Sequence, residues 1–87
     1  MREQYKQILK SFFCEKVLYQ RNAMEISQEE MAYRLSMAVR TYVDIEHGRT
    51  CCSALTLVLF LVYLCDTPIV FLEELKDAFE GNNKKTA

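Results

Sequence analysis

Glycine and proline are scarce in this sequence, with two glycines and one proline among 87 residues. Because all-β sandwiches and barrels use these residues at their turns, the scarcity predicts helices. There is no excess of basic charge: the net charge of −1 argues against a protein that coats nucleic acid without discrimination. The start of the chain lacks the apolar run of a signal peptide, since Arg2, Glu3, Lys6 and Lys10 interrupt it. Hydrophobic residues make up 51%, which excludes an intrinsically disordered chain and is typical of one small domain.

The four cysteines form no motif of a metal site or of a disulfide framework. They are Cys14, Cys51, Cys52 and Cys65, so no two are separated by the two residues of a zinc ribbon's CxxC pair. The adjacent pair cannot form an ordinary bridge without strain. His47 and Cys51 are spaced to share a metal, but the favoured interpretation is reduced, buried thiols in a cytoplasmic protein. We therefore expect no metal and no cofactor.

Apolar spacing and capping residues predict an all-α chain of five helices. Ser27 followed by Glu30 is a capping box, Gly48 is a helix C-terminal cap, Ser53 is a further N-cap, and Thr67-Pro68 is typical of a helix start. The predicted helices span residues 2–24, 28–35, 39–47, 54–65 and 68–79. Residues 1–80 are then a single domain and residues 81–87 a disordered polar tail. The apolar run of residues 54–65 is shorter than the ~20 residues of a membrane span, so we expect no membrane contact.

Residues 28–47 have the pattern of a helix-turn-helix. Two short helices that cross at a wide angle need a small residue where they touch, and Ala32 supplies it. Ser36 falls at the tight turn, where glycine would adopt a positive φ more easily. Met31, Leu35, Met37, Tyr42 and Ile45 are the apolar residues expected to fill the space between the helices.

Three pieces of sequence resemble a known family. They are Arg21, the run Ile-Ser-Gln-Glu-Glu-Met-Ala at residues 26–32, and Ile-Glu-His-Gly-Arg at residues 45–49. Their order and spacing are similar to the R…(L/I)SQEELA…IExG pattern of the phage-repressor/Cro-like (XRE-type) helix-turn-helix DNA-binding domains. The resemblance covers Val17 to Leu75 and implies a five-helix, repressor-like bundle, here with an extended first helix.

The resemblance implies roles for several residues. Arg21 and Glu46 would pair beneath the third helix, which the family places in the major groove. Arg40 would contact guanine, Val39 a thymine methyl group, and Gln28 a phosphate, whereas Asp44 has the wrong sign for a phosphate but can accept from cytosine. The residues expected to contact DNA are Gln28, Ala38, Val39, Arg40, Thr41, Asp44, Arg49 and Thr50.

An apolar stripe on the fourth and fifth helices is where this sequence departs most from the family, whose members have polar residues at the equivalent positions of the fourth helix. Its members are Leu55, Leu59, Val62, Ile69 and Val70. Such a patch usually marks an interface, which predicts a homodimer with its recognition helices about one DNA turn apart. The alternative is that the first helix folds over the stripe through Tyr5, Ile8 and Phe12.

Together these features predict a regulator of transcription that binds double-stranded DNA as a homodimer on a palindromic operator. The alternative is a protein-interaction module on the same scaffold, such as an antitoxin or an accessory subunit. A continuous positive surface around Arg40, Arg49 and the start of the second helix would favour DNA, and an acidic or apolar one would favour protein. No catalytic arrangement is present, so we expect neither an enzyme nor a small-molecule ligand.

Overall fold

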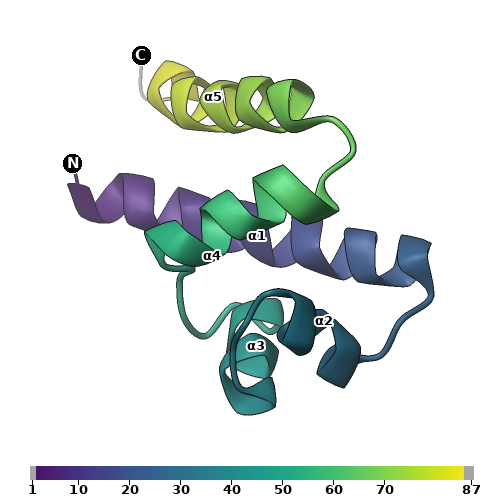
Figure 1. Ribbon diagram of the computed structural model, residues 1–87. Helices are drawn as coiled ribbons and strands as arrows, with labels where there is room; N and C mark the ends of the chain where they lie inside the picture. The colour runs from purple at the N-terminus through teal and green to yellow at the C-terminus, as the bar shows by residue number, and fades with distance from the viewer. Residues whose placement is uncertain (1, 86–87) are drawn as a thin grey trace.

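The computed structural model describes residues 2–85, with side chains described to residue 81. The chain is all-α, as predicted. Its elements are α1 (Arg2–Met24), α2 (Gln28–Arg34), α3 (Val39–Glu46), α4 (Ala54–Leu59), the π-helical segment η1 (Phe60–Leu64) and α5 (Pro68–Lys85). In Figure 1, α1 crosses the middle of the molecule, α2 and α3 lie below it, and α5 lies above it. α1 packs against both α3 and α5, so it joins the two ends of the bundle.

Polar caps begin the helices where the sequence predicts them. The Ser27 hydroxyl accepts a hydrogen bond from the Glu30 amide at 3.1 Å, and the Ser53 hydroxyl accepts one from the Thr56 amide at 3.2 Å. Pro68 is the first residue of α5, where its missing N–H costs nothing. The Glu30 carboxylate accepts from the guanidinium of Arg34, one turn further along α2, at 3.1 Å.

Left-handed backbone conformations create the sharp turns around α2 and α3. Ser36, between these helices, has a φ of 56°, as expected for the turn of a helix-turn-helix. Gly48 has a φ of 74° just after α3 and ends that helix as predicted. Glu25 adopts a φ of 55° between α1 and α2, a feature that the sequence did not indicate.

α2 and α3 each end one residue earlier than predicted, and two other helices differ from the prediction by more than that. The predicted fourth helix is α-helical only to Leu59 and continues as η1, where the Cys65 amide donates to the Phe60 carbonyl, five residues back, at 2.8 Å. The fifth helix continues past Phe79 to Lys85. Residues 81–85 of the predicted tail are thus helical because Gly81 does not end the helix, and residues 86 and 87 lie outside the described part of the chain.

The core is aromatic and lies where α1 meets the other helices. The buried apolar residues are Phe13, Val17, Met31, Ala32, Leu35, Tyr42, Ile45, Phe60, Leu64, Phe71 and Leu75. Phe12 packs edge-on against Phe71, with ring centroids 5.1 Å apart, and Tyr5 against Phe79 at 5.0 Å. The early turns of α1 thus pack on α5. The stripe residues Leu55, Val62, Ile69 and Val70 remain exposed, so the first helix does not cover them as the alternative required.

Among the helices in the described part of the chain, none is long and apolar enough to cross a membrane.

Candidate nucleic-acid interface

A buried carboxylate anchors the end of α3 to the rest of the bundle. Glu46 is 6% exposed, in the last turn of the helix. Its two oxygens accept from Arg21 of α1, at 2.7 Å from Nε and 3.1 Å from Nη2. This bidentate geometry is the strong form of an arginine–carboxylate pair. The ion pair expected from the sequence is therefore formed.

Two further donors complete the environment of Glu46, and neither was expected from the sequence. The Tyr42 hydroxyl donates to it at 2.6 Å, and Gln28 Nε2 donates at 3.0 Å. Tyr42 precedes Glu46 by four residues, so the two share one face of α3, and this spacing was an available signal. Arg21 also donates from Nη1 to the Ile26 carbonyl at 3.1 Å. The network therefore fixes α3 against both α1 and the beginning of α2.

The network also fixes the charge state of Glu46. Burial disfavours the charged carboxylate, but hydrogen bonds from Arg21, Tyr42 and Gln28 outweigh this and lower the pKa of Glu46 to about 2. Burial, together with the hydrogen bond to Glu46, raises the pKa of the Tyr42 hydroxyl. At neutral pH Glu46 is therefore an ionised carboxylate, and both of its oxygens accept hydrogen bonds. This arrangement fits a structural role and not proton transfer.

The opposite side of α3 faces solvent. Val39, Arg40 and Thr41 are exposed, as is Ala38 at the N-cap position, whereas Tyr42 on the other face is fully buried. Within the described residues, the Arg40 side chain forms neither an ion pair nor a side-chain hydrogen bond. The structure thus places these predicted reading residues together on one accessible helical surface.

Other arginines near this surface are paired with acids. Arg49 donates to Asp44 at 2.9 Å and also lies 3.2 Å from His47 Nδ1, and Arg34 pairs with Glu30. The charges of Asp44 and Arg49 therefore compensate each other. With Glu29 and Glu30 in the first turn of α2, the surface has mixed sign and is not continuously positive.

Gln28, the first residue of α2, and Thr50 are the remaining predicted contact residues. One amide hydrogen of Gln28 is used by Glu46, which holds the side chain against α3 and leaves its second hydrogen for another acceptor. Thr50 is exposed in the loop after α3.

The Cys14 thiol makes a hydrogen bond within the fold, and Cys52 packs against the core. Cys14 Sγ donates to the Glu46 carbonyl at 2.9 Å, satisfying an acceptor at the end of α3, and burial raises the pKa of this thiol. Burial and the neighbouring Cys51 raise the pKa of Cys52 to about 12. Among the described residues, no three His, Cys, Asp or Glu side chains gather closely enough to hold a metal ion.

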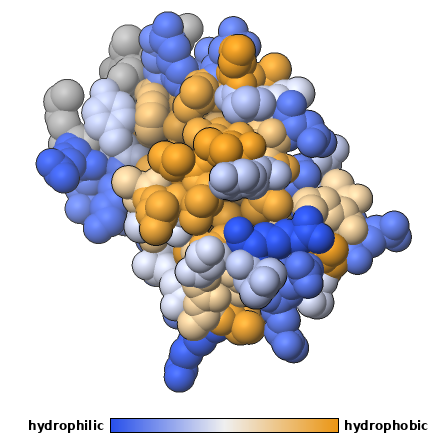
Figure 2. All heavy atoms as spheres, in the orientation of Figure 1, coloured by the Kyte–Doolittle hydropathy of each residue, from blue (hydrophilic) through white to orange (hydrophobic). Residues whose placement is uncertain are grey.

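The second feature of the surface is an apolar face on α4, η1 and α5. Leu55 and Val62 are 65% and 64% exposed, and Ile69 and Val70 are also exposed. Leu59 was expected to be an exposed member of this stripe, but it is half-buried and packs against the core. Val58, Tyr63 and Leu72 are exposed there instead. Figure 2 shows a broad hydrophobic area over the centre of the molecule, where α4 lies in Figure 1.

Comparison of the chain with protein-family models, with curated proteins and with solved structures finds no match in any of the three. A function is therefore inferred from the geometry of this surface and from the motif resemblance.

Proposed function

We propose that the protein is a cytoplasmic regulator of transcription that binds double-stranded DNA through α3, as the Cro-like resemblance implies. The observation that carries the proposal is the division of α3 into two sides. One side is held by the Arg21–Glu46 network, and the other presents Val39, Arg40 and Thr41 to solvent. A rigidly held helix with a solvent-facing arginine near its N-terminus is what major-groove recognition requires.

Four side chains have a defined part in this proposal. Arg40 donates two hydrogen bonds to a guanine, and Val39 contacts a thymine methyl group. Gln28 donates its second amide hydrogen to a backbone phosphate, in a position fixed by its bond to Glu46. Arg49 reaches a phosphate by exchanging its exposed pair with Asp44, which costs little because such pairs contribute at most about 1 kcal/mol.

We further propose that the apolar face pairs two copies of the chain. This face points toward the viewer in Figure 2, whereas α3 lies along the lower edge of the molecule in Figure 1. A two-fold axis in front of the molecule, running from α5 toward α3, would join the two apolar faces and leave both copies of α3 on the same side. That arrangement suits a palindromic site.

The second candidate is a protein-interaction module on the same scaffold. The observation that favours it is the pairing of Arg34 with Glu30 and of Arg49 with Asp44, which removes free positive charge from the surface around α3. Non-specific DNA affinity depends on such charge. The mixed charge around α3 therefore weakens non-specific DNA binding and favours a protein partner.

Selection of fragments from a random duplex library at low salt separates the two candidates. We expect the wild-type protein to enrich an inverted repeat with half-sites about one helical turn apart. Arg34→Ala removes an arginine that is paired with Glu30 and is not among the proposed contact residues, so it should enrich the same repeat. Failure of the wild-type protein to enrich any sequence, under conditions in which a known regulator does so, would refute DNA binding and favour the protein partner.

A further inference from the structure

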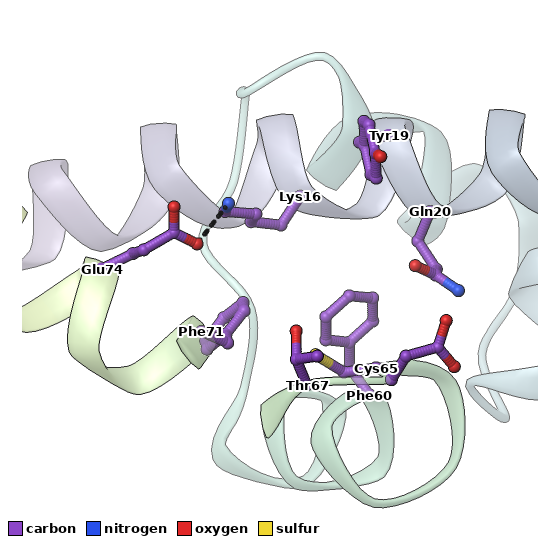
Figure 3. Close-up of a pocket in the computed structure, with 9 residues that line it drawn as sticks. Lys16, Tyr19, Gln20, Phe60, Cys65, Thr67, Phe71 and Glu74 are labelled. Carbon is purple, nitrogen blue, oxygen red and sulfur yellow. Dashed lines mark hydrogen bonds and ion pairs between the residues drawn. The ribbon is translucent and has the colours of Figure 1, made fainter. Parts of the chain in front are cut away.

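Positive charge gathers on the first half of α1, on the side that faces the loop after α3. Arg2, Lys6 and Lys10 follow one another at intervals of four residues, so their side chains lie on successive turns of one face. We call these three residues the basic stripe. None of them forms an ion pair with a residue whose side chain is described. Lys16, further along α1, differs because it pairs with Glu74 at 2.9 Å, as the dashed line in Figure 3 shows.

The basic stripe lies beside the loop that joins α3 to α4. In Figure 1 this loop rises from α3 to the beginning of α4, next to the N-terminal half of α1. One turn after Lys10, the Cys14 thiol donates to a carbonyl at the end of α3, at 2.9 Å. Lys6 and Lys10 line one groove together with Arg49 and Thr50, and an adjoining groove extends to the beginning of the stripe. The stripe is therefore continuous with the part of the candidate interface that follows α3.

The side chains of this groove are of the kinds that contact DNA phosphates. The lining consists of lysine, arginine, glutamine and threonine, together with Glu3 and Cys51. Protein partners are usually held by aromatic or apolar anchors, and none of the described lining residues is aromatic. The adjoining groove contains two rings, but Tyr5 and Phe79 pack edge-on against each other, with centroids 5.0 Å apart. The chemistry of the groove thus favours a phosphate backbone over an acidic peptide.

The charge of the stripe is spread along the helix. Two steps of four residues place Arg2 about 12 Å from Lys10 along the axis of α1. A small anion needs donors that converge on one point, whereas a row of cations suits a row of phosphates. Glu3, whose carboxylate accepts from Gln7 at 3.3 Å, lines the groove but does not cancel the stripe. The stripe therefore carries the unpaired positive charge that the surface around α3 lacks.

We propose that the basic stripe binds the phosphate backbone of the same duplex that α3 reads, next to the phosphate reached by Arg49. This inference rests on the DNA binding proposed above and adds a second contact region to it. Lys6 and Lys10 donate to neighbouring phosphates and release their counterions, which supplies salt-dependent affinity for any sequence. Arg40 supplies the discrimination between sequences.

The salt dependence of binding tests the proposal on the selected operator and on a random duplex of the same length. The slope of log K against log salt concentration reports how many phosphates the protein neutralises. Replacing both lysines, Lys6→Gln with Lys10→Gln, should reduce that slope by about 2 per bound copy of the chain on both duplexes, since each contact contributes about 0.9. Lys76→Gln, which removes an exposed lysine of α5, should leave the slope unchanged. The double variant should keep the Tm and the guanine discrimination of wild type, because neither lysine has a described partner and Arg40 is retained.

A second variant acts in the opposite direction. Glu3→Gln removes the acidic side chain of the groove and should tighten binding to both duplexes. Glu15→Gln removes an exposed carboxylate from the same helix outside the groove and should leave the affinity unchanged. A gain of affinity cannot result from a failure to fold.

The outcomes separate this inference from the proposed function. Equal slopes for wild type and the double lysine variant, on a duplex that the wild-type protein binds, would overturn the role of the stripe and leave reading by α3 intact. Failure of the wild-type protein to bind any duplex would overturn both. Polyglutamate that binds as tightly as the random duplex, and more weakly to the double lysine variant, would overturn the inference in favour of an acidic protein partner.

Discussion

Replacing Arg21 with methionine removes two of the four hydrogen bonds that reach the Glu46 carboxylate. It also removes the bond from Arg21 to the Ile26 carbonyl. Methionine retains much of the aliphatic stem, so the change isolates the lost charge and the lost donors. The buried carboxylate then keeps only the neutral donors Gln28 and Tyr42.

The cost can be estimated in two ways from the structure. Removing one partner of a buried pair costs about 3–5 kcal/mol, and the 19% exposure of the Arg21 side chain places this pair near the lower value. The fall in the pKa of Glu46 from 4.5 to about 2 corresponds to about 3 kcal/mol at neutral pH for all its donors together, net of burial, and among these donors Arg21 lowers the pKa most. In a domain of this size each kcal/mol lowers the Tm by about 4–8 °C, so we expect a fall of at least about 12 °C.

Thermal unfolding followed by circular dichroism at pH 7 measures this fall. Arg34→Met is the matched control, because its exposed pair with Glu30 is worth about 0.3–0.5 kcal/mol and should change the Tm by less than about 4 °C. The effect also depends on pH. The pKa of Glu46 is lower in the folded state, so its contribution is complete above about pH 4.5 and is lost as the pH falls toward 2. The difference between wild type and Arg21→Met should shrink over that range.

Equal Tm values for wild type and Arg21→Met at pH 7 would refute this reasoning. So would a fall no larger than that of Arg34→Met, because the buried pair would then contribute no more than an exposed one.

Three further substitutions test the turns and the apolar face. Gly48→Ala should lower the free energy of unfolding by about 1 kcal/mol in chemical denaturation, because a φ of 74° is strained for any residue with a side chain. An unchanged midpoint would contradict this. Ser36→Gly should raise the free energy of unfolding by about 0.5 kcal/mol, because the relief of backbone strain at a φ of 56° exceeds the cost of the added unfolded-state entropy. A lower free energy of unfolding would contradict this. Leu55→Lys should abolish dimers in sedimentation, whereas Tyr33→Lys, which changes an exposed residue on α2, should preserve them. A wild-type protein that is monomeric at micromolar concentration would rule out the dimer. Leu55 suits this test better than the half-buried Leu59.

Local signals predicted much of the fold. Ser27 and Ser53 begin helices, and Gly48 ends one, because capping depends on residues adjacent in sequence. The family resemblance, in addition, implied the Arg21–Glu46 pair, which joins residues 25 positions apart. The helix caps need no knowledge of the rest of the molecule, whereas the pair was inferred from the resemblance.

The features that the sequence did not predict depend on tertiary packing. The π-helical turn begins at Phe60, whose ring packs on Phe13 and Phe71, and periodicity along one helix cannot reveal such contacts. The donation from Cys14 to the Glu46 carbonyl joins residues 32 positions apart. The pair between Asp44 and Arg49 forms only because the chain reverses at Gly48, and it changes the charge of the candidate interface.

The most direct test of DNA reading by α3 compares wild type and Arg40→Ala on the selected operator and on its single-base variants, by fluorescence anisotropy over a range of salt concentrations. For the wild-type protein, we expect one guanine in each half-site whose replacement costs about 1–3 kcal/mol. Arg40→Ala should lose that discrimination while it keeps its Tm and its salt-dependent, non-specific binding. Equal discrimination by the two proteins at every position would contradict the placement of α3 in the major groove.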